Sequence, residues 1–110
     1  MDGVTEKEVV YSDFITPDLQ EIFNYGKDTF GIYHAEQYVL NIIEEIDSLK
    51  TSYFLHPQCR RIETKSKIYR NIVVDSHLVI YRISEKIEVL RIIHSASSNN
   101  KIKQVRQVQT

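Results

Sequence analysis

The chain has 110 residues, of which 42% are hydrophobic and 26% charged, a usual balance for a single water-soluble globular domain. No window holds the roughly 18 uninterrupted apolar residues that a membrane helix needs, and the acidic N-terminal segment lacks the apolar core of an export signal. Because Cys59 is the single cysteine, no internal disulfide can form, and the four histidines share no zinc-ligand spacing with it. We therefore expect a cytoplasmic protein with no metal site and no other cofactor.

Charge is distributed unevenly along the chain. Residues 1–55 carry three lysines and eleven carboxylates, whereas residues 56–110 carry eleven lysines and arginines and four carboxylates. The halves therefore differ in sign, although the net charge of the whole chain is −1. A basic half favours a polyanion or an acidic peptide as partner. Mutual attraction of the two halves within one fold is the alternative.

The first half predicts one short strand and a helix. Residues 7–11 are β-branched and aromatic enough for a strand. A helix start follows, in which Thr16 can cap the first turn, Pro17 suits the first helical position and Asp18 complements the helix dipole. This helix should end near Thr29, before the glycine at position 31.

A second helix is predicted from Ile32 to Leu49 or Ser52. Its apolar residues recur at steps of three and four, which is the clearest periodic pattern in the sequence. Two amphipathic helices joined by a few residues form a helical hairpin, and neither can bury its apolar face alone. The predicted sheet of the second half is the available surface.

The second half predicts strands. Residues 58–64 are a candidate edge strand, and three main strands occupy 69–94, separated by short polar breaks at 75–77 and 84–86. Such short connections favour antiparallel pairing. Residues 99–110 are basic and polar, and predict either a mobile tail or a short helix.

The whole pattern predicts an α+β fold with an N-terminal strand, a helical hairpin and a sheet of three or four antiparallel strands. We place the domain at residues 1–98, with 99–110 outside it. Both faces of the sheet are largely apolar in sequence. The hairpin covers one face, so either a bound partner segment or the folded-back C-terminal segment must cover the other.

Each main strand carries one arginine inside an apolar run: Arg70, Arg82 and Arg91. Strict alternation places Arg70 with Ile72 and Val74, Arg82 with Leu78 and Ile80, and Arg91 with Val89 and Ile93. A buried arginine needs an acceptor. Carboxylates are scarce in this half, which favours an anionic ligand for the arginines, whereas pairing of Arg82 with Glu88 or with an acid of the hairpin is the structural alternative.

The helical segment DLQEIFNYGKDTFGIYHAEQYVLNIIEEIDSL, residues 18–49, resembles the hairpin of the RelE/ParE superfamily of bacterial toxins. The later segments IYRNIVV, LVIYRI and VLRIIH resemble the closing strands of that family, so that the likeness spans residues 7–98. The resemblance implies the toxin of a type II toxin–antitoxin pair, often called a plasmid stabilisation protein. Its partner would be a cognate antitoxin, bound in a hetero-oligomer.

Two mechanisms occur in that superfamily, and they need different residues. ParE-like members inhibit DNA gyrase by binding, whereas RelE-like members cut messenger RNA on the ribosome. The hairpin pattern is closer to ParE, so gyrase inhibition is the preferred interpretation. A third hypothesis is that the chain has kept only the fold of this family and is a non-toxic interaction module.

If the chain is an endoribonuclease, the resemblance and the residue types point to His94 as acid with Arg70 and Arg82 at the phosphate, and to Glu63 or Lys65 as base. Arg91 would be a further phosphate clamp. Against catalysis, His94 precedes Ser95 rather than the tyrosine often present in RelE-like proteins. The predicted target-binding or phosphate-binding residues are Lys65, Lys67, Arg70, Arg82 and Arg91.

Overall fold

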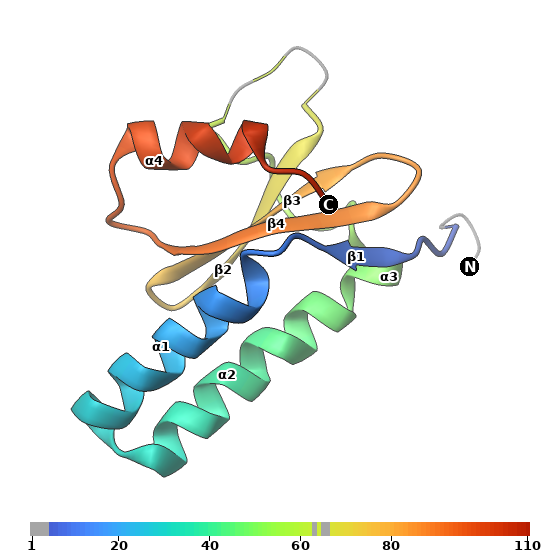
Figure 1. The fold of residues 1–110 in the computed structure, drawn as a ribbon. Coiled ribbons are helices and arrows are strands. Elements are labelled where there is room, and N and C mark those ends of the chain that lie inside the picture. The colour runs from blue at the N-terminus through green and yellow to red at the C-terminus, as the bar shows by residue number, and fades with distance from the viewer. Residues whose placement is uncertain (1–4, 63, 65–66) are drawn as a thin grey trace.

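A four-stranded sheet separates two layers of helix in the computed structural model, which describes residues 5–62, 64 and 67–110 (Figure 1). The strands lie in the order β1-β4-β3-β2. The elements are β1 (Val9–Tyr11), α1 (Ile15–Phe30), α2 (Ile32–Asp47), α3 (Leu49–Ser52), β2 (Tyr69–Val74), β3 (His77–Ile83), β4 (Ile87–His94), α4 (Asn99–Lys103) and the 3-10 helix η1 (Gln104–Gln107). The predicted α+β fold is confirmed.

The sheet is antiparallel from β2 to β4 and gains a parallel edge from β1. The Asp75-Ser76 turn joins β2 to β3, and Asp75 has a φ of +50°, a left-handed conformation that aspartate tolerates better than most residues. β1 returns to the sheet beside β4, with Val9 opposite Ile87. The N-terminal strand therefore covers part of the β4 edge.

Helix α1 begins at Ile15, two residues before Pro17, the first helical position that the sequence pattern indicates. Its N-cap is Phe14, whose side chain makes no capping bond, and Thr16 lies inside the first turn. Ser12 precedes the helix, and its Oγ accepts from the Phe14 N–H at 3.2 Å while its carbonyl accepts from the Ile15 N–H at 3.2 Å. The helix ends at Phe30, one residue beyond the predicted end.

The two long helices pack closely near the hairpin turn. A Cβ at Gly26 would lie 3.3 Å from the Ala35 Cβ, so a side chain there would push the helices apart. Gly31, with φ of +94°, connects the helices. The predicted second helix is divided in two, because α2 ends at Asp47 and α3 resumes at Leu49.

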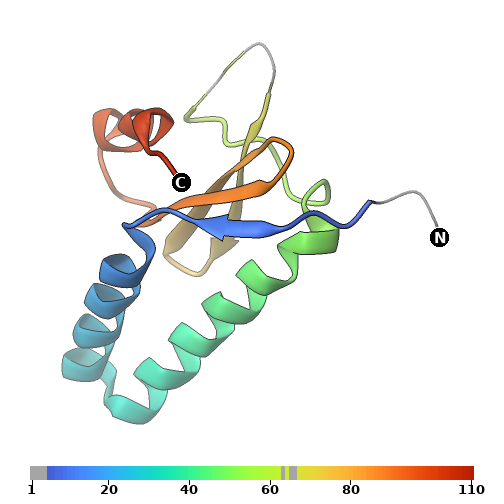
Figure 2. The same ribbon diagram turned by 45° about the vertical axis from the view of Figure 1, so that its right-hand side comes forward.

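Each face of the sheet has its own apolar cluster. The α1–α2 face buries residues such as Ile42, Ile46, Val79 and Tyr81, and Figure 2 shows the two helices together on that side. The opposite face is covered by α4 and η1, where Ile102 and Val105 are buried beside Leu90. The C-terminal segment of this chain, rather than a partner, covers the second face of the sheet.

Two details of the strand prediction are wrong. Residues 58–64 form no strand in the part that the structure describes, where an isolated bridge joins Gln58 to Arg70. The alternation along β4 also breaks, because Ile80 pairs with Arg91 whereas Tyr81 pairs with Val89, leaving Leu90 as an extra residue. Val89 therefore faces the helical hairpin, while Leu90 and Ile93 face α4.

Among the described residues, no helix has the length and apolar character that crossing a membrane requires.

Candidate functional site on the sheet

Arg82 lies on the α4 face of β3 and is held by a carboxylate of the neighbouring strand. Its Nε and Nη2 donate to the two carboxylate oxygens of Glu88 at 3.1 and 2.7 Å. Nη1 reaches Tyr69 Oη at 3.3 Å, and Nη2 also lies 3.4 Å from the Val108 carbonyl. The hydrogen bonds from Arg82 lower the pKa of Glu88 to about 2, because they stabilise its charged form. The structural alternative of an Arg82–Glu88 pair is therefore what the structure contains.

Arg91 is engaged by the helical hairpin. Its Nε and Nη2 donate to the Asp18 carboxylate at 2.9 and 2.8 Å, and its guanidinium stacks 4.4 Å from the centre of the Phe14 ring. Asp18 also accepts from the Ile92 N–H at 2.9 Å. This backbone group lies on the β4 edge just beyond the point where β1 stops pairing. Asp18, which the sequence pattern assigned to the helix dipole, therefore caps a sheet edge.

Arg70 lies near the outer edge of the sheet on β2. Its Nη1 donates to the carbonyls of Phe54 and His56 at 3.1 and 2.7 Å, and the guanidinium stacks 5.4 Å from the Phe54 ring centre. Its Nε is buried without a hydrogen-bond partner. Arg70 is opposite Tyr81, on the hairpin face, whereas Arg82 is on the α4 face. The two arginines thus lie on opposite faces of the sheet.

His94 ends β4 at the far end of the sheet from Arg82. It is exposed, its Nδ1 accepts from the Ala96 N–H at 3.0 Å, and its ring lies edge-on to His77 at 5.3 Å. His77 pairs with His94 in the ladder, whereas Arg82 pairs with Glu88. Five steps along β3 at about 3.3 Å each separate these positions by about 16 Å. The structure does not bring the predicted acid and the predicted phosphate-binding arginines together.

His77, which the sequence reasoning did not select, has a polar partner of its own. The hydroxyl of Tyr38 on α2 lies 2.7 Å from His77 Nδ1 and donates to the Val74 carbonyl at 2.9 Å. Burial and the nearby His94 lower the pKa of His77, so its ring is predominantly neutral at pH 7. Tyr38 lies on the inner side of α2, and a tyrosine in such a position is the sequence signal for a hydrogen bond of this kind. The sequence does not show that the partner is His77.

The predicted lysines lie at the connection before β2. Lys67 is exposed and has a φ of +55°, and its backbone N–H donates to Thr64. Lys65 and Glu63 lie outside the described residues. Lys67 therefore remains a predicted target-binding residue.

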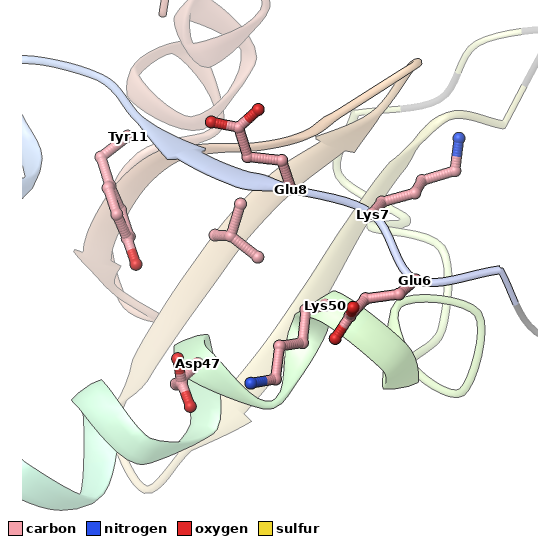
Figure 3. A pocket seen from close by; sticks show the side chains of 7 residues that line it. Glu6, Lys7, Glu8, Tyr11, Asp47 and Lys50 are labelled. Atoms are coloured by element: carbon pink, nitrogen blue, oxygen red, sulfur yellow. The ribbon is translucent and has the colours of Figure 1, made fainter.

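Two of the surface hollows differ in the character of their lining. Figure 3 shows one of about 380 Å³ where β1 passes α2 and α3, lined by Glu6, Lys7, Glu8, Val9, Tyr11, Asp47 and Lys50. It mixes opposite charges and contains none of the predicted site residues. A more apolar hollow of about 440 Å³ lies between the hairpin and the β2–β3 turn, beside Tyr25, Phe30 and Tyr38.

Large apolar side chains remain exposed along the outside of the helical hairpin. On α2, Tyr33 is 66% exposed and Leu40 is 52% exposed, seven positions apart and thus on one side of the helix. Tyr25 and Phe30 of α1 are likewise exposed. A surface of this kind is typical of a protein–protein interface.

Residues 9–98 match the family model described as "ParE toxin of type II toxin-antitoxin system, parDE". The chain belongs to the ParE toxin family. Toxin ParE1 of Caulobacter vibrioides is 25% identical to it over 80 residues, which cover 72% of this chain and 79% of that protein. A solved structure of the chromosomal ParDE system of P. aeruginosa superimposes with a TM-score of 0.68 at 18% identity. That superposition covers 81% of this chain and 96% of the other, and confirms the fold shared by ParE proteins.

Proposed function

We propose that this member of the ParE family arrests growth by binding and inhibiting DNA gyrase, without cutting RNA, and that a cognate antitoxin neutralises it. The observation that carries the proposal is the arrangement of the cationic side chains. Arg82 and Arg91 each already donate from Nε and Nη2 to both oxygens of one carboxylate, that of Glu88 and that of Asp18 respectively. Such forks are not available to stabilise a reacting phosphate.

Endonucleolytic cleavage also requires a base, an acid and cations around one phosphate. His94 and Arg82 lie at opposite ends of the β3–β4 ladder, and Arg70 serves the other face of the sheet. A binding inhibitor needs no such convergence. The geometry therefore supports the ParE-like mechanism over the RelE-like one that the sequence left open.

The test of the target is a supercoiling reaction with purified gyrase and relaxed plasmid. We expect the chain to inhibit supercoiling, and we expect DNA synthesis to fall before protein synthesis in pulse-labelled cells after induction. The His94→Ala variant should retain full growth arrest, because that side chain is exposed and bonded locally. Cleaved transcripts with an early fall in protein synthesis, or loss of arrest in folded His94→Ala, would overturn the proposal.

The antitoxin is expected to dock on the exposed apolar side chains of the hairpin. Leu40→Arg should reduce co-purification with the product of an adjacent antitoxin gene by at least tenfold, because it places a charge in an apolar contact. Asn41→Arg is the matched control, since Asn41 is exposed on the same helix about 100° away. Equal binding by wild type and both variants would place the antitoxin interface elsewhere.

A further inference from the structure

A basic hollow lies beside α4. Figure 1 shows α4 on the side of the sheet away from the helical hairpin. It has a volume of about 460 Å³ and is formed by the segment after α3 and by α4 with η1. Its lining residues are Arg60, Arg61, Ile62, Asn99, Lys103 and Arg106. Among the residues that the structure describes, neither a carboxylate nor an aromatic ring belongs to this lining.

Arg61 fixes the two walls of the basic hollow relative to each other. Its Nη1 donates to the Ser95 carbonyl at 2.7 Å and its Nη2 to the Ser97 carbonyl at 2.6 Å. Nε and Nη2 also donate to Asn99 Oδ1 at 3.0 and 2.8 Å. Arg61 therefore links the two walls of the hollow through four hydrogen bonds.

The floor beneath the cations is packed. Ile62 is 1% exposed and Ile102 is fully buried, and both belong to the apolar cluster on this face of the sheet. The Cys59 N–H bonds to the Tyr69 carbonyl at 2.9 Å, which ties the same segment to β2. Cations set on such a floor need less ordering on binding than cations on a free tail.

Three cations of the basic hollow remain exposed: Arg60, Lys103 and Arg106. The Arg106 Nε donates to the Lys103 carbonyl at 3.3 Å, and within the described residues none of the three side chains forms an ion pair. In contrast, α1 and α2 with the residue between them carry seven carboxylates and one lysine. The molecule therefore presents a basic side and an acidic side, with the sheet between them.

We propose that the basic hollow binds the phosphate backbone of duplex DNA. Three exposed cations around a fixed hollow supply what phosphate contacts need, and arginine presents a fork of donors that suits phosphate oxygens. A single strand is disfavoured because no aromatic ring of the lining can stack on a base. An acidic peptide is disfavoured because the apolar residue of the lining, Ile62, is buried and offers no anchoring pocket.

The experiment measures fluorescence anisotropy of a labelled 20-base-pair duplex titrated with the full chain between 50 and 200 mM salt. Three phosphate contacts predict that log K falls with log salt at a slope of about −2.7. The triple variant Arg60→Gln, Lys103→Gln, Arg106→Gln should lose at least tenfold in affinity at 50 mM salt, with a slope near zero. Lys27→Gln, Lys50→Gln, Lys86→Gln removes the same charge elsewhere and should stay within twofold of wild type.

The single variant Arg60→Gln controls for a folding defect in the triple variant, because Arg60 is exposed and its replacement removes no buried contact. We expect an unchanged circular dichroism spectrum and a slope shallower by about 0.9. The proposal is overturned if the wild type does not bind at 50 mM salt, if the control triple loses as much affinity as the test triple, or if a single-stranded RNA or a glutamate-rich peptide displaces the duplex at lower concentration. Duplex binding requires no gyrase, so its failure and the failure of the gyrase proposal are separate results.

Discussion

The sheet carries two arginine–carboxylate pairs of the same geometry and different reach. Arg82 and Glu88 are six positions apart on adjacent strands, and their pair stays within the sheet. Arg91 and Asp18 are 73 positions apart, and Asp18 bonds the Ile92 backbone as well as the guanidinium. The first pair joins two adjacent strands of the sheet, whereas the second attaches the helical hairpin to the sheet. Although the hydrogen bonds of the two pairs are similar, loss of the second pair should lower the free energy of unfolding more than loss of the first.

The largest effect is expected from Asp18→Ala. It leaves the Arg91 guanidinium and the Ile92 N–H without their acceptor, and removing one partner of a largely buried pair costs about 3 kcal/mol. Urea unfolding should show this as a lower midpoint with an unchanged slope. Asp28→Ala, an exposed position of the same helix, should change the free energy of unfolding by less than about 0.5 kcal/mol. Similar midpoints for the two variants would remove the distinction drawn between the pairs.

A smaller loss is expected from Glu88→Ala, at about 2 kcal/mol, because Arg82 keeps contacts to the Tyr69 hydroxyl and the Val108 carbonyl. The same urea experiment measures it. Glu85→Ala in the adjacent exposed turn is the matched control and should be close to neutral. A loss greater than that of Asp18→Ala would reverse the order of the two pairs.

The Glu88 carboxylate should also make the free energy of unfolding depend on pH. The pKa of Glu88 is lowered to about 2 in the folded chain from an ordinary value of 4.5. Its stabilisation is therefore complete above about pH 4.5 and is lost as the pH falls toward 2. The difference in unfolding free energy between wild type and Glu88→Gln should narrow across that window. A constant difference from pH 6 to pH 2 would contradict the assigned role of the carboxylate.

The smallest effect is expected at the C-terminal residue. Thr110 Oγ1 donates to Glu88 Oε1 at 2.8 Å in an exposed position. Thr110→Val should lower the thermal midpoint only slightly, corresponding to about 0.5 kcal/mol, because water replaces an exposed hydrogen bond. Gln109→Val controls for the added apolar surface. A loss equal to that of Glu88→Ala would mean that Thr110 positions the whole pair.

The fold was predictable because local patterns determine its elements. The apolar spacing in 32–49 has one helical solution, and the short polar breaks at 75–77 and 84–86 permit hairpins. The start of α1 was less predictable, since the helix begins at Ile15, ahead of the expected cap at Thr16. The parallel pairing of β1 with β4 has no local signal, because it depends on the path of the hairpin between them.

The site was less predictable because its partners are distant in sequence. Asp18 suits a helix N-terminus, and nothing near it in sequence points to Arg91. The extra residue Leu90 in β4 moves Val89 to the hairpin face, which strict alternation cannot anticipate. Ile102 and Val105 gave only a weak pattern within a basic segment, and their burial depends on the apolar face that the three main strands leave open.

The pairing of β1 with β4 also has a consequence for how the chain folds during synthesis. Val9 lies opposite Ile87, 78 positions later, so the last strand must leave the ribosome before the first can take its place. Contacts of such sequence separation slow folding, because a long loop must close before they form. A nascent chain can form the helical hairpin early, but it completes the sheet only once β4 has been synthesised. Activity that depends on the intact sheet therefore requires that β4 has left the ribosome.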